Sequence, residues 1–115
     1  MNIEDAREYC LSLPGVTEDM PYGPDWVVFR IEGKIIMHIW LEAPVSTIAI
    51  KLPPALGEEL RDRYNGVTAA YHLNKVHWND IFIEDFPDDM VKEWINTSYK
   101  LVISHLPLKL RTKYE

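Results

Sequence analysis

Residues 26–41, Trp-Val-Val-Phe-Arg-Ile-Glu-Gly-Lys-Ile-Ile-Met-His-Ile-Trp-Leu, decide the fold of this chain. Apolar side chains recur at alternate positions on both sides of Glu32-Gly33, which is typical of half-buried β-strands. Because glycine adopts a positive φ without a steric penalty, Glu32-Gly33 suits a short hairpin connection. The stretch therefore predicts antiparallel strands at Trp26 to Ile31 and Lys34 to Leu41, and we expect a third strand at Thr47 to Leu52.

Strand alternation divides the side chains of these strands between two faces of the predicted sheet. The expected core face is apolar and consists of Val27, Phe29, Ile31, Ile35, Met37, Ile39, Leu41, Ile48, Ile50 and Leu52. The opposite face is mixed and consists of Trp26, Val28, Arg30, Ile36, His38, Trp40, Thr47, Ala49 and Lys51. If all helices pack on the core face, this second face is open or covered by a partner. The candidates for an interaction surface on it are Trp26, Val28, Ile36 and Trp40.

Three helices complete the predicted core. Asn2 can cap a first helix that Pro14-Gly15 ends, and the acid- and proline-rich residues 17–24 predict a loop. Pro53-Pro54 opens a short helix that reaches about Tyr64, and Pro87 opens a long helix that reaches about His105. The long helix carries an apolar stripe of Val91, Trp94, Ile95, Ser98, Val102 and Leu106.

A second hairpin is expected at residues 67–83, with strands at Val67 to Leu73 and Val76 to Ile83 and a tight turn at Asn74-Lys75. In that register His72 faces His77, with Cβ atoms about 5 Å apart. Such a pair is a candidate for proton transfer or for metal ligation; the alternative is two histidines that hydrogen-bond locally. A third metal ligand would have to come from Asp80, His38 or a distant segment, and we expect no metal site and no cofactor.

Composition narrows the class of protein. The chain has 115 residues, a net charge of −6 and one cysteine, Cys10, so it fits a single domain over residues 1–115 without internal disulfides or a cysteine-based zinc site. The acidic N-terminus does not resemble a signal peptide, and no apolar run reaches the roughly 18 residues that span a bilayer. We therefore expect a cytoplasmic protein that does not bind membranes. The net charge opposes indiscriminate binding to nucleic acid.

Basic and aromatic residues nevertheless mark a candidate nucleic-acid surface. Lysines and arginines on strands and turns can contact phosphates, and histidines and tryptophans can touch bases. The alternative is that the basic side chains are solvated and that the aromatic side chains pack in the core. The candidates are Arg30, Lys34, Lys51, Lys75, His72, His77 and Trp78.

Several short motifs, in this order and spacing, carry a resemblance to a known family. They are Leu13 to Glu18, Pro21-Tyr22-Gly23, Gly33-Lys34-Ile35, Tyr71 to Lys75 with His77-Trp78, and Ser98 to Val102. With them the chain resembles the MmcQ/YjbR family of small bacterial proteins over nearly its whole length. The resemblance implies a two-layer α+β fold, α-β(3)-α-β(2)-α, with an antiparallel sheet and its helices on one face, similar to type III secretion chaperones. It also implies a DNA-binding-like, double-wing arrangement of the hairpins and no catalytic residues.

Three functions remain as alternatives. The first is a non-catalytic module that binds DNA or another nucleic acid through its basic hairpin turns, with Lys34, Lys75, His77 and Trp78 as wing contacts. The second is a chaperone-like adaptor, or a homodimer, that uses the open sheet face. The third is an enzyme built on His72, His77 and Asp80. Because no phosphate loop, nucleophile elbow or zinc motif occurs in the sequence, we expect that the protein is not an enzyme.

Overall fold

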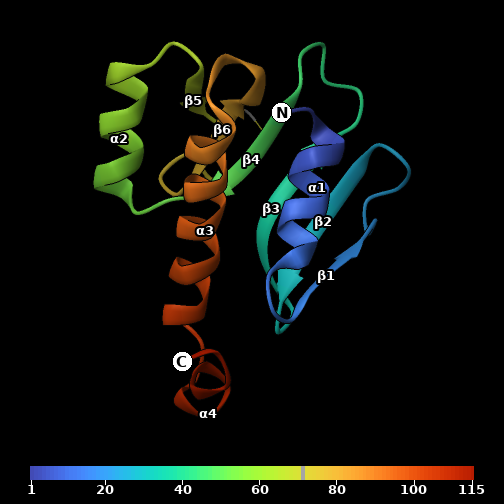
Figure 1. Ribbon diagram of the computed structural model, residues 1–115, viewed down its shortest axis with the longest axis vertical. Helices are drawn as coiled ribbons and strands as arrows, with labels where there is room; N and C mark the ends of the chain where they lie inside the picture. Colours follow the sequence, from blue (N-terminus) through green and yellow to red (C-terminus); the bar gives the residue numbers. More distant parts are fainter. Residues whose placement is uncertain (71) are drawn as a thin grey trace.

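The computed structural model describes residues 1–70 and 72–115, and these form a six-stranded sheet in the order β1-β2-β3-β4-β6-β5. Every neighbouring pair of strands is antiparallel. The strands are β1 Val16–Asp19, β2 Trp26–Ile31, β3 Lys34–Trp40, β4 Thr47–Lys51, β5 Val67–Ala69 and β6 Trp78–Phe82. Helices α1 and α3 lie across one face of this sheet, and α2 lies beside β5 (Figure 1). The predicted α+β class with an antiparallel sheet is confirmed.

Helices α1, α2 and α3 lie close to their expected bounds, whereas the short helix α4 was not predicted. They are α1 Ile3–Ser12, α2 Pro54–Arg63, α3 Asp88–Ser104 and the short α4 Leu108–Arg111, with 3-10 turns η1 Ile83–Asp85 and η2 Thr112–Tyr114. At the start of α1, the Asp5 backbone N–H donates to Asn2 Oδ1 at 2.9 Å, and the Asn2 N–H donates to Asp5 Oδ2 at 3.0 Å. This capping box satisfies two N–H groups that the helix itself leaves without partners. None of the helices in the described parts of the chain is long and apolar enough to cross a membrane.

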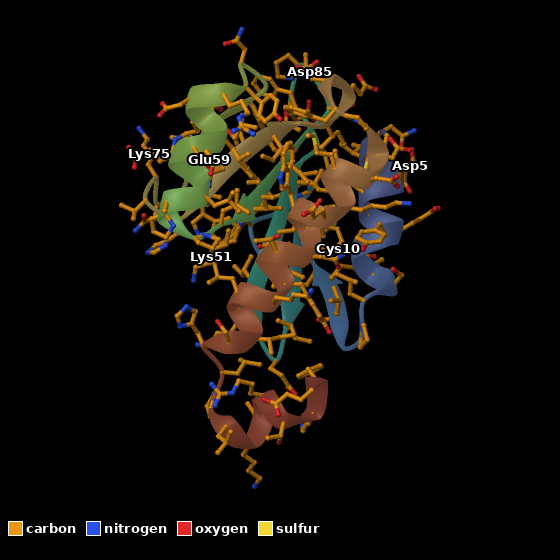
Figure 2. The ribbon with its side chains drawn as sticks, turned by 60° about the vertical axis from the view of Figure 1, so that its left-hand side comes forward. Asp5, Cys10, Lys51, Glu59, Lys75 and Asp85 are labelled. Carbon is orange, nitrogen blue, oxygen red and sulfur yellow. The ribbon has the colours of Figure 1, made fainter. Side chains whose placement is uncertain are left out.

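The core fills the space between the sheet and α1, α2 and α3. Helix α3 contributes Val91, Trp94, Ile95, Ser98 and Val102 of its predicted stripe, and Tyr99 joins them. Leu106, the last residue of the predicted stripe, is buried but follows the end of the helix. Ser98 is fully buried, yet its hydroxyl donates to the Ile36 carbonyl at 2.6 Å and accepts from the Lys51 backbone N–H at 3.0 Å. These two hydrogen bonds satisfy a polar group inside the core and fix α3 against β3 and β4. Cys10 lies at the junction of α1 and α3 (Figure 2), and burial raises the pKa of its thiol to about 12.

Ile36 belongs to this core, so its predicted place on the open face was wrong. Phe29 pairs with Met37, whereas Arg30 pairs with Ile35, so β3 carries one extra residue opposite β2. Such a bulge shifts the inward and outward alternation by one position, which turns Ile36 towards the helices. Two exposures also differ from expectation: Val28 is fully buried, and Leu41, expected in the core, is 42% exposed.

The second hairpin differs from the predicted one in its turn and its register. Strands β5 and β6 pair, but their connection spans residues 70–77, and Tyr71, which the prediction put in the strand, lies outside the described residues. Thr68 pairs with Asp80, whereas the expected register would have paired Ala69 with Asp80. A shift of one residue exchanges the two faces of a strand, so the predicted pairing of His72 with His77 does not occur.

The loop predicted over residues 17–24 is in part a strand. Val16–Asp19 forms β1 at the edge of the sheet, where Glu18 pairs with Phe29 and Asp19 pairs with Val28. Two ion pairs hold this acidic strand: Arg7 contacts Glu18 at 2.5 Å, and Arg30 contacts Asp19 at 3.0 Å. Tertiary contacts have therefore overridden the low strand propensity of acidic residues.

Candidate functional site

The face of the sheet turned away from α1 and α3, here called the open face, carries two rows of side chains. Residues that pair directly across strands point to the same side of a sheet. The first row consists of Val28, His38, Ala49, Asp80 and Thr68, and the second contains the pairs Trp26–Trp40 and Thr47–Phe82. Ala49 lies between His38 and Asp80 and is much smaller than either. The sheet therefore has a hollow at its centre, between an imidazole and a carboxylate.

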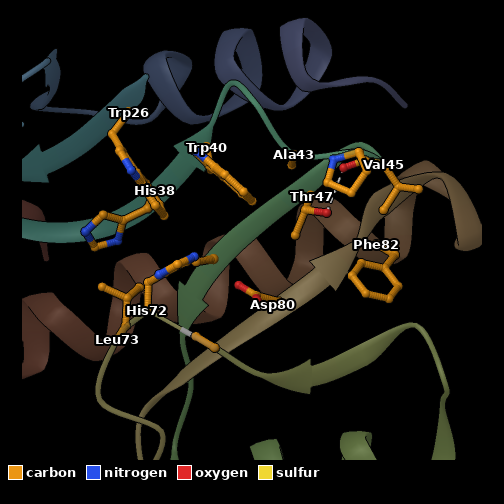
Figure 3. Close-up of a pocket in the computed structure, with 13 residues that line it drawn as sticks. Trp26, His38, Trp40, Ala43, Val45, Thr47, His72, Leu73, Asp80 and Phe82 are labelled. Atoms are coloured by element: carbon orange, nitrogen blue, oxygen red, sulfur yellow. Dashed lines mark hydrogen bonds between the residues drawn. The ribbon is translucent and has the colours of Figure 1, made fainter. Parts of the chain in front are cut away.

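This hollow is the floor of a pocket with a volume of about 450 Å³. Its walls come from the loop Ala43–Pro44–Val45 and from Ala70, His72 and Leu73 in the β5–β6 connection. In Figure 3, Trp26 and His38 lie at one end of the pocket, Val45 and Phe82 lie at the other, and the helices lie behind the sheet. The hydroxyl of Thr47 donates to the Val45 carbonyl at 2.8 Å, which ties the loop to β4. The volume lies within the range of sites that bind small molecules.

His38 is the unusual residue of this site. It is only 3% exposed, and neither of its ring nitrogens has a hydrogen-bond partner among the described residues. Aromatic rings cover it instead: Trp78 meets it edge-on with centroids 4.9 Å apart, Trp26 does so at 6.0 Å, and Tyr22 stacks on it at 6.4 Å. Burial, and to a lesser degree the charge of Arg30, lowers the pKa of His38 to about 4. The imidazole is therefore neutral at pH 7 and offers one donor and one acceptor nitrogen.

Two tryptophans and a histidine form the edge of the pocket. The rings of Trp26 and Trp40 stack with centroids 5.9 Å apart and planes 17° apart. His72 meets both edge-on, at 5.6 Å from Trp26 and 5.5 Å from Trp40. Trp26 and Trp40 are half-buried, and both line the pocket. This arrangement provides flat apolar surfaces of the kind that hold planar or cationic groups.

The structure separates the predicted site residues into two groups. His72 and Trp26 line the aromatic pocket with Trp40, and so does Asp80, which the sequence indicated as a possible third metal ligand and as part of an enzyme site. Arg30, Lys34, Lys51 and Trp78 line a different depression of about 500 Å³, together with His105 from the end of α3. His77 lines neither of these two, and Lys75 is exposed on the β5–β6 connection at the margin of the molecule beside α2 (Figure 2).

Sequence reasoning missed several residues of the pocket. The loop Ala43–Val45 gave no signal, because a loop's position over a sheet depends on tertiary structure. For Phe82 the sequence did contain a signal. Trp78, Asp80 and Phe82 occupy alternate positions along β6, and this period places all three on the open face. No group of three or more His, Cys, Asp or Glu residues that could hold a metal ion occurs in the described parts of the chain.

Comparison with known proteins identifies the family of this chain. A family model described as YjbR matches residues 11–101. The protein named "Uncharacterized protein YjbR" from Escherichia coli K12 is 25% identical over 114 residues, which cover 96% of this chain and 95% of that protein. "Uncharacterized protein YbdF" from Escherichia coli O157:H7 is 33% identical over 104 residues, which cover 90% of this chain and 85% of that protein. The chain belongs to the YjbR family.

Solved structures show the same fold. The crystal structure of protein DR2400 from Deinococcus radiodurans, a DUF419 domain, has a TM-score of 0.90 at 25% identity and covers 98% of this chain and 87% of that one. A crystal structure of a Pseudomonas syringae protein has a TM-score of 0.75 at 26% identity and covers 88% of this chain and 98% of that one. In both cases the likeness extends over most of this chain.

Proposed function

We propose that this YjbR-family protein is a non-catalytic binding domain whose aromatic pocket takes a small, largely apolar ligand. The observation that carries the proposal is His38, a buried imidazole in the lining of a pocket, whose two ring nitrogens have no hydrogen-bond partner among the residues that the structure describes. Burying a polar group without a hydrogen bond costs about 1–3 kcal/mol. A domain that only had to fold would be more stable with an apolar residue at this central position of β3.

The rest of the lining supports the same function. Ala43, Pro44, Val45, Leu73 and Phe82 give the pocket an apolar wall, and Thr47, His72 and Asp80 supply a few polar groups. Mostly apolar walls with a small number of polar groups that fix orientation are typical of ligand sites. The pocket is built largely on β2, β3, β4 and β6, and a rigid sheet is a preorganised support for binding.

A catalytic role has less support from the geometry. The enzyme hypothesis required His72, His77 and Asp80 to converge, but His77 does not line the pocket that His72 and Asp80 share. His38 is neutral and covered by aromatic rings, so it is poorly placed to exchange protons with a substrate. We therefore propose that the domain binds its ligand without catalysing a reaction.

The test uses the indole N–H signals of the four tryptophans in an NMR titration with neutral aromatic fragments such as indole. Trp26 and Trp40 border the pocket, whereas Trp94 packs against Tyr64 and Phe86 on the helix side of the sheet. Binding at the pocket should shift the Trp26 and Trp40 signals and leave the Trp94 signal unchanged. Uniform shifts of all four signals, or none at millimolar fragment, would count against the site.

A matched pair of variants locates the binding. Ala49→Phe places a ring in the hollow between His38 and Asp80 and should abolish the shifts of the Trp26 and Trp40 signals. Ala55→Phe makes the same change at an exposed position of α2, away from the pocket, and should bind fragments like the wild type. If Ala49→Phe does not fold, Ala49→Leu is the milder replacement. Equal binding by all variants would refute the assignment.

One observation favours nucleic-acid binding as a second function. Four of the seven predicted contacts, Arg30, Lys34, Lys51 and Trp78, come together in the depression beside the end of α3. Cationic side chains beside an aromatic ring can contact a backbone phosphate and a stacked base. The Arg30 guanidinium already donates to Asp19 at 3.0 Å and to the Gly33 carbonyl at 3.1 Å, so only part of its donor capacity is left for a phosphate.

A salt series with labelled single-stranded and duplex DNA tests this second function. Binding that weakens steeply with salt and is lost in Lys34→Glu/Lys51→Glu would support it. Lys92→Glu/Lys109→Glu makes the same change in net charge outside the depression and serves as the control. Lys75→Glu tests the double-wing arrangement separately.

An adaptor or homodimer role would use the open face. Of the four contacts expected for that role, Val28 and Ile36 are buried, which leaves Trp26 and Trp40.

A further inference from the structure

We propose that the ligand of the aromatic pocket is an organic cation, with an ammonium group carried on an apolar body. The inference rests on the function proposed above, because it specifies the ligand of the same pocket. Three features of the lining support it: its charges, its accessible tryptophan rings and the hollow over Ala49.

The charges of the lining favour a cation over an anion. Asp80 is the one acidic side chain among the described lining residues, and neither lysine nor arginine is among them. His38 is uncharged at pH 7, because burial holds its pKa near 4. Two basic residues of the same strands do not line the pocket: Arg30 forms an ion pair with Asp19, and Lys51 lines the separate depression. An anionic ligand would therefore lose its hydration without gaining a cationic partner in the lining.

The tryptophans supply the second feature. The face of an indole ring attracts cations more strongly than any other side-chain ring. Trp26 and Trp40 present two nearly parallel indoles at one end of the pocket, and His72 packs edge-on against both. Figure 3 shows the ring of Trp40, the ring of His72 and the carboxylate of Asp80 around the same space. An ammonium group there would lie beside an aromatic face and an acidic side chain at once.

The hollow over Ala49 decides where the apolar body lies. Neighbouring strands are about 4.8 Å apart, so the two registered pairs that join His38 to Ala49 and Ala49 to Asp80 separate the outer two backbones by about 10 Å. The methyl group of Ala49 fills little of this distance. An ammonium group between Trp40 and Asp80 leaves the body of the ligand to extend over the methyl group of Ala49 and along Phe82, which lies two residues from Asp80 on the same face of β6.

Three probes with one body and different head groups test the proposal. They are 2-phenylethylamine, which is cationic at pH 7, 2-phenylethanol, which is neutral, and 3-phenylpropanoate, which is anionic. Dissociation constants come from the shifts of the Trp26 and Trp40 indole signals, with the Trp94 signal as internal reference. We expect the amine to bind roughly tenfold or more tightly than the alcohol, which corresponds to about 1.4 kcal/mol, and the anion to bind most weakly.

Two variants assign the preference to its source. Asp80→Asn keeps the shape of the side chain and should bring the affinities for amine and alcohol to within roughly threefold of each other, since the aromatic faces remain. Asp62→Asn removes one negative charge from an exposed position of α2 and should leave the wild-type ratio unchanged. Unchanged binding of 2-phenylethanol shows that Asp80→Asn has kept the pocket intact.

The outcomes separate this inference from the function on which it rests. Equal or tighter binding of the alcohol or the anion at Trp26 and Trp40 overturns the cation preference and leaves the ligand pocket in place. Binding of all three probes that persists in Ala49→Phe overturns the pocket as well. Failure of all three to shift either signal at millimolar concentration overturns both.

Discussion

Replacement of His38 by leucine should make the stability of this protein less dependent on pH between pH 7 and pH 4. In the folded protein, burial lowers the pKa of His38 to about 4, against an ordinary value of 6.5. As the pH falls below 6.5, the unfolded chain takes up a proton at this position while the folded protein does not, so protonation favours unfolding. The stabilising effect of the neutral imidazole is complete above pH 6.5 and is lost as the pH falls towards 4.

The magnitude follows from the size of the pKa shift. Each pKa unit corresponds to 1.36 kcal/mol, and the difference between 6.5 and about 4 gives a loss of about 3 kcal/mol over this interval. That loss is a large fraction of the roughly 5–15 kcal/mol that stabilises an ordinary domain. At pH 7 the leucine variant should also gain about 1–3 kcal/mol, because an unpartnered buried polar group is removed, less the contacts that the imidazole made with Trp78.

Urea unfolding of both proteins at intervals from pH 7 to pH 4 measures the effect. The other titrating groups are common to the two proteins, so the difference between their free energies of unfolding isolates His38. We expect this difference to grow by about 3 kcal/mol in favour of the variant as the pH falls. His38→Phe, which keeps an aromatic ring against Trp78, guards against a packing effect particular to leucine. Parallel curves for both variants and the wild type would refute the reasoning, as would an NMR titration that places the pKa of His38 near 6.5.

Three further changes test the fold that carries the site. Ser98→Ala should cost about 1–3 kcal/mol in urea unfolding, because the Lys51 N–H then loses its acceptor and Ile36 its donor inside the core; an unchanged midpoint would contradict this. Asn2→Ala should cost about 1 kcal/mol through loss of the α1 capping box, measured by thermal unfolding, whereas the exposed Asn65→Ala should cost less. Gly15→Ala should lower the melting temperature more than Gly33→Ala does. Both glycines have φ near +80°, but of the two only Gly15 has a position where a Cβ would meet Ile31 Cδ1 at 2.7 Å. Equal melting temperatures would disprove the contact.

Alternation of apolar residues was sufficient to predict strands β2, β3 and β4, because most residues of these strands alternate between the core face and the open face. The bulge at Ile36 was beyond that reasoning. Ile35 and Ile36 are adjacent isoleucines, so either can face the core, and only the pairing with β2 decides between them. The register of the second hairpin was wrong for a different reason, because it was derived from a two-residue turn at Asn74-Lys75 whereas the pairing of β5 and β6 ends at Ala69 and Asn79. Asn74 does take part in a turn, since its Oδ1 accepts from the Val76 N–H at 2.9 Å.

The pocket was predictable only in part for a related reason. Trp26, His38, Trp40, Thr47 and Ala49 were assigned to one face by parity, and the structure shows that they do line a common site. The sequence could not show that Ala43–Val45 would cover one end of it, nor that the ring nitrogens of His38 would have no hydrogen-bond partner within residues 1–70 and 72–115. Both facts depend on contacts between segments far apart in the chain.

Trp78 makes the two candidate sites of this molecule interdependent. Its indole packs edge-on against His38, which lines the aromatic pocket, and it also lines the basic depression with Lys51, its partner across the β4–β6 pair. A molecule that moves this ring at one site therefore changes the packing of the other. The cation proposed for the pocket and a phosphate at the depression have opposite charges, so one ligand that carried both groups could span Trp78, whereas separate ligands would bind with coupled affinities. The dissociation constant of 2-phenylethylamine, measured with and without inorganic phosphate, distinguishes coupled from independent sites. If the sites are coupled, phosphate changes the affinity for the amine, and the amine changes the affinity for phosphate by the same factor.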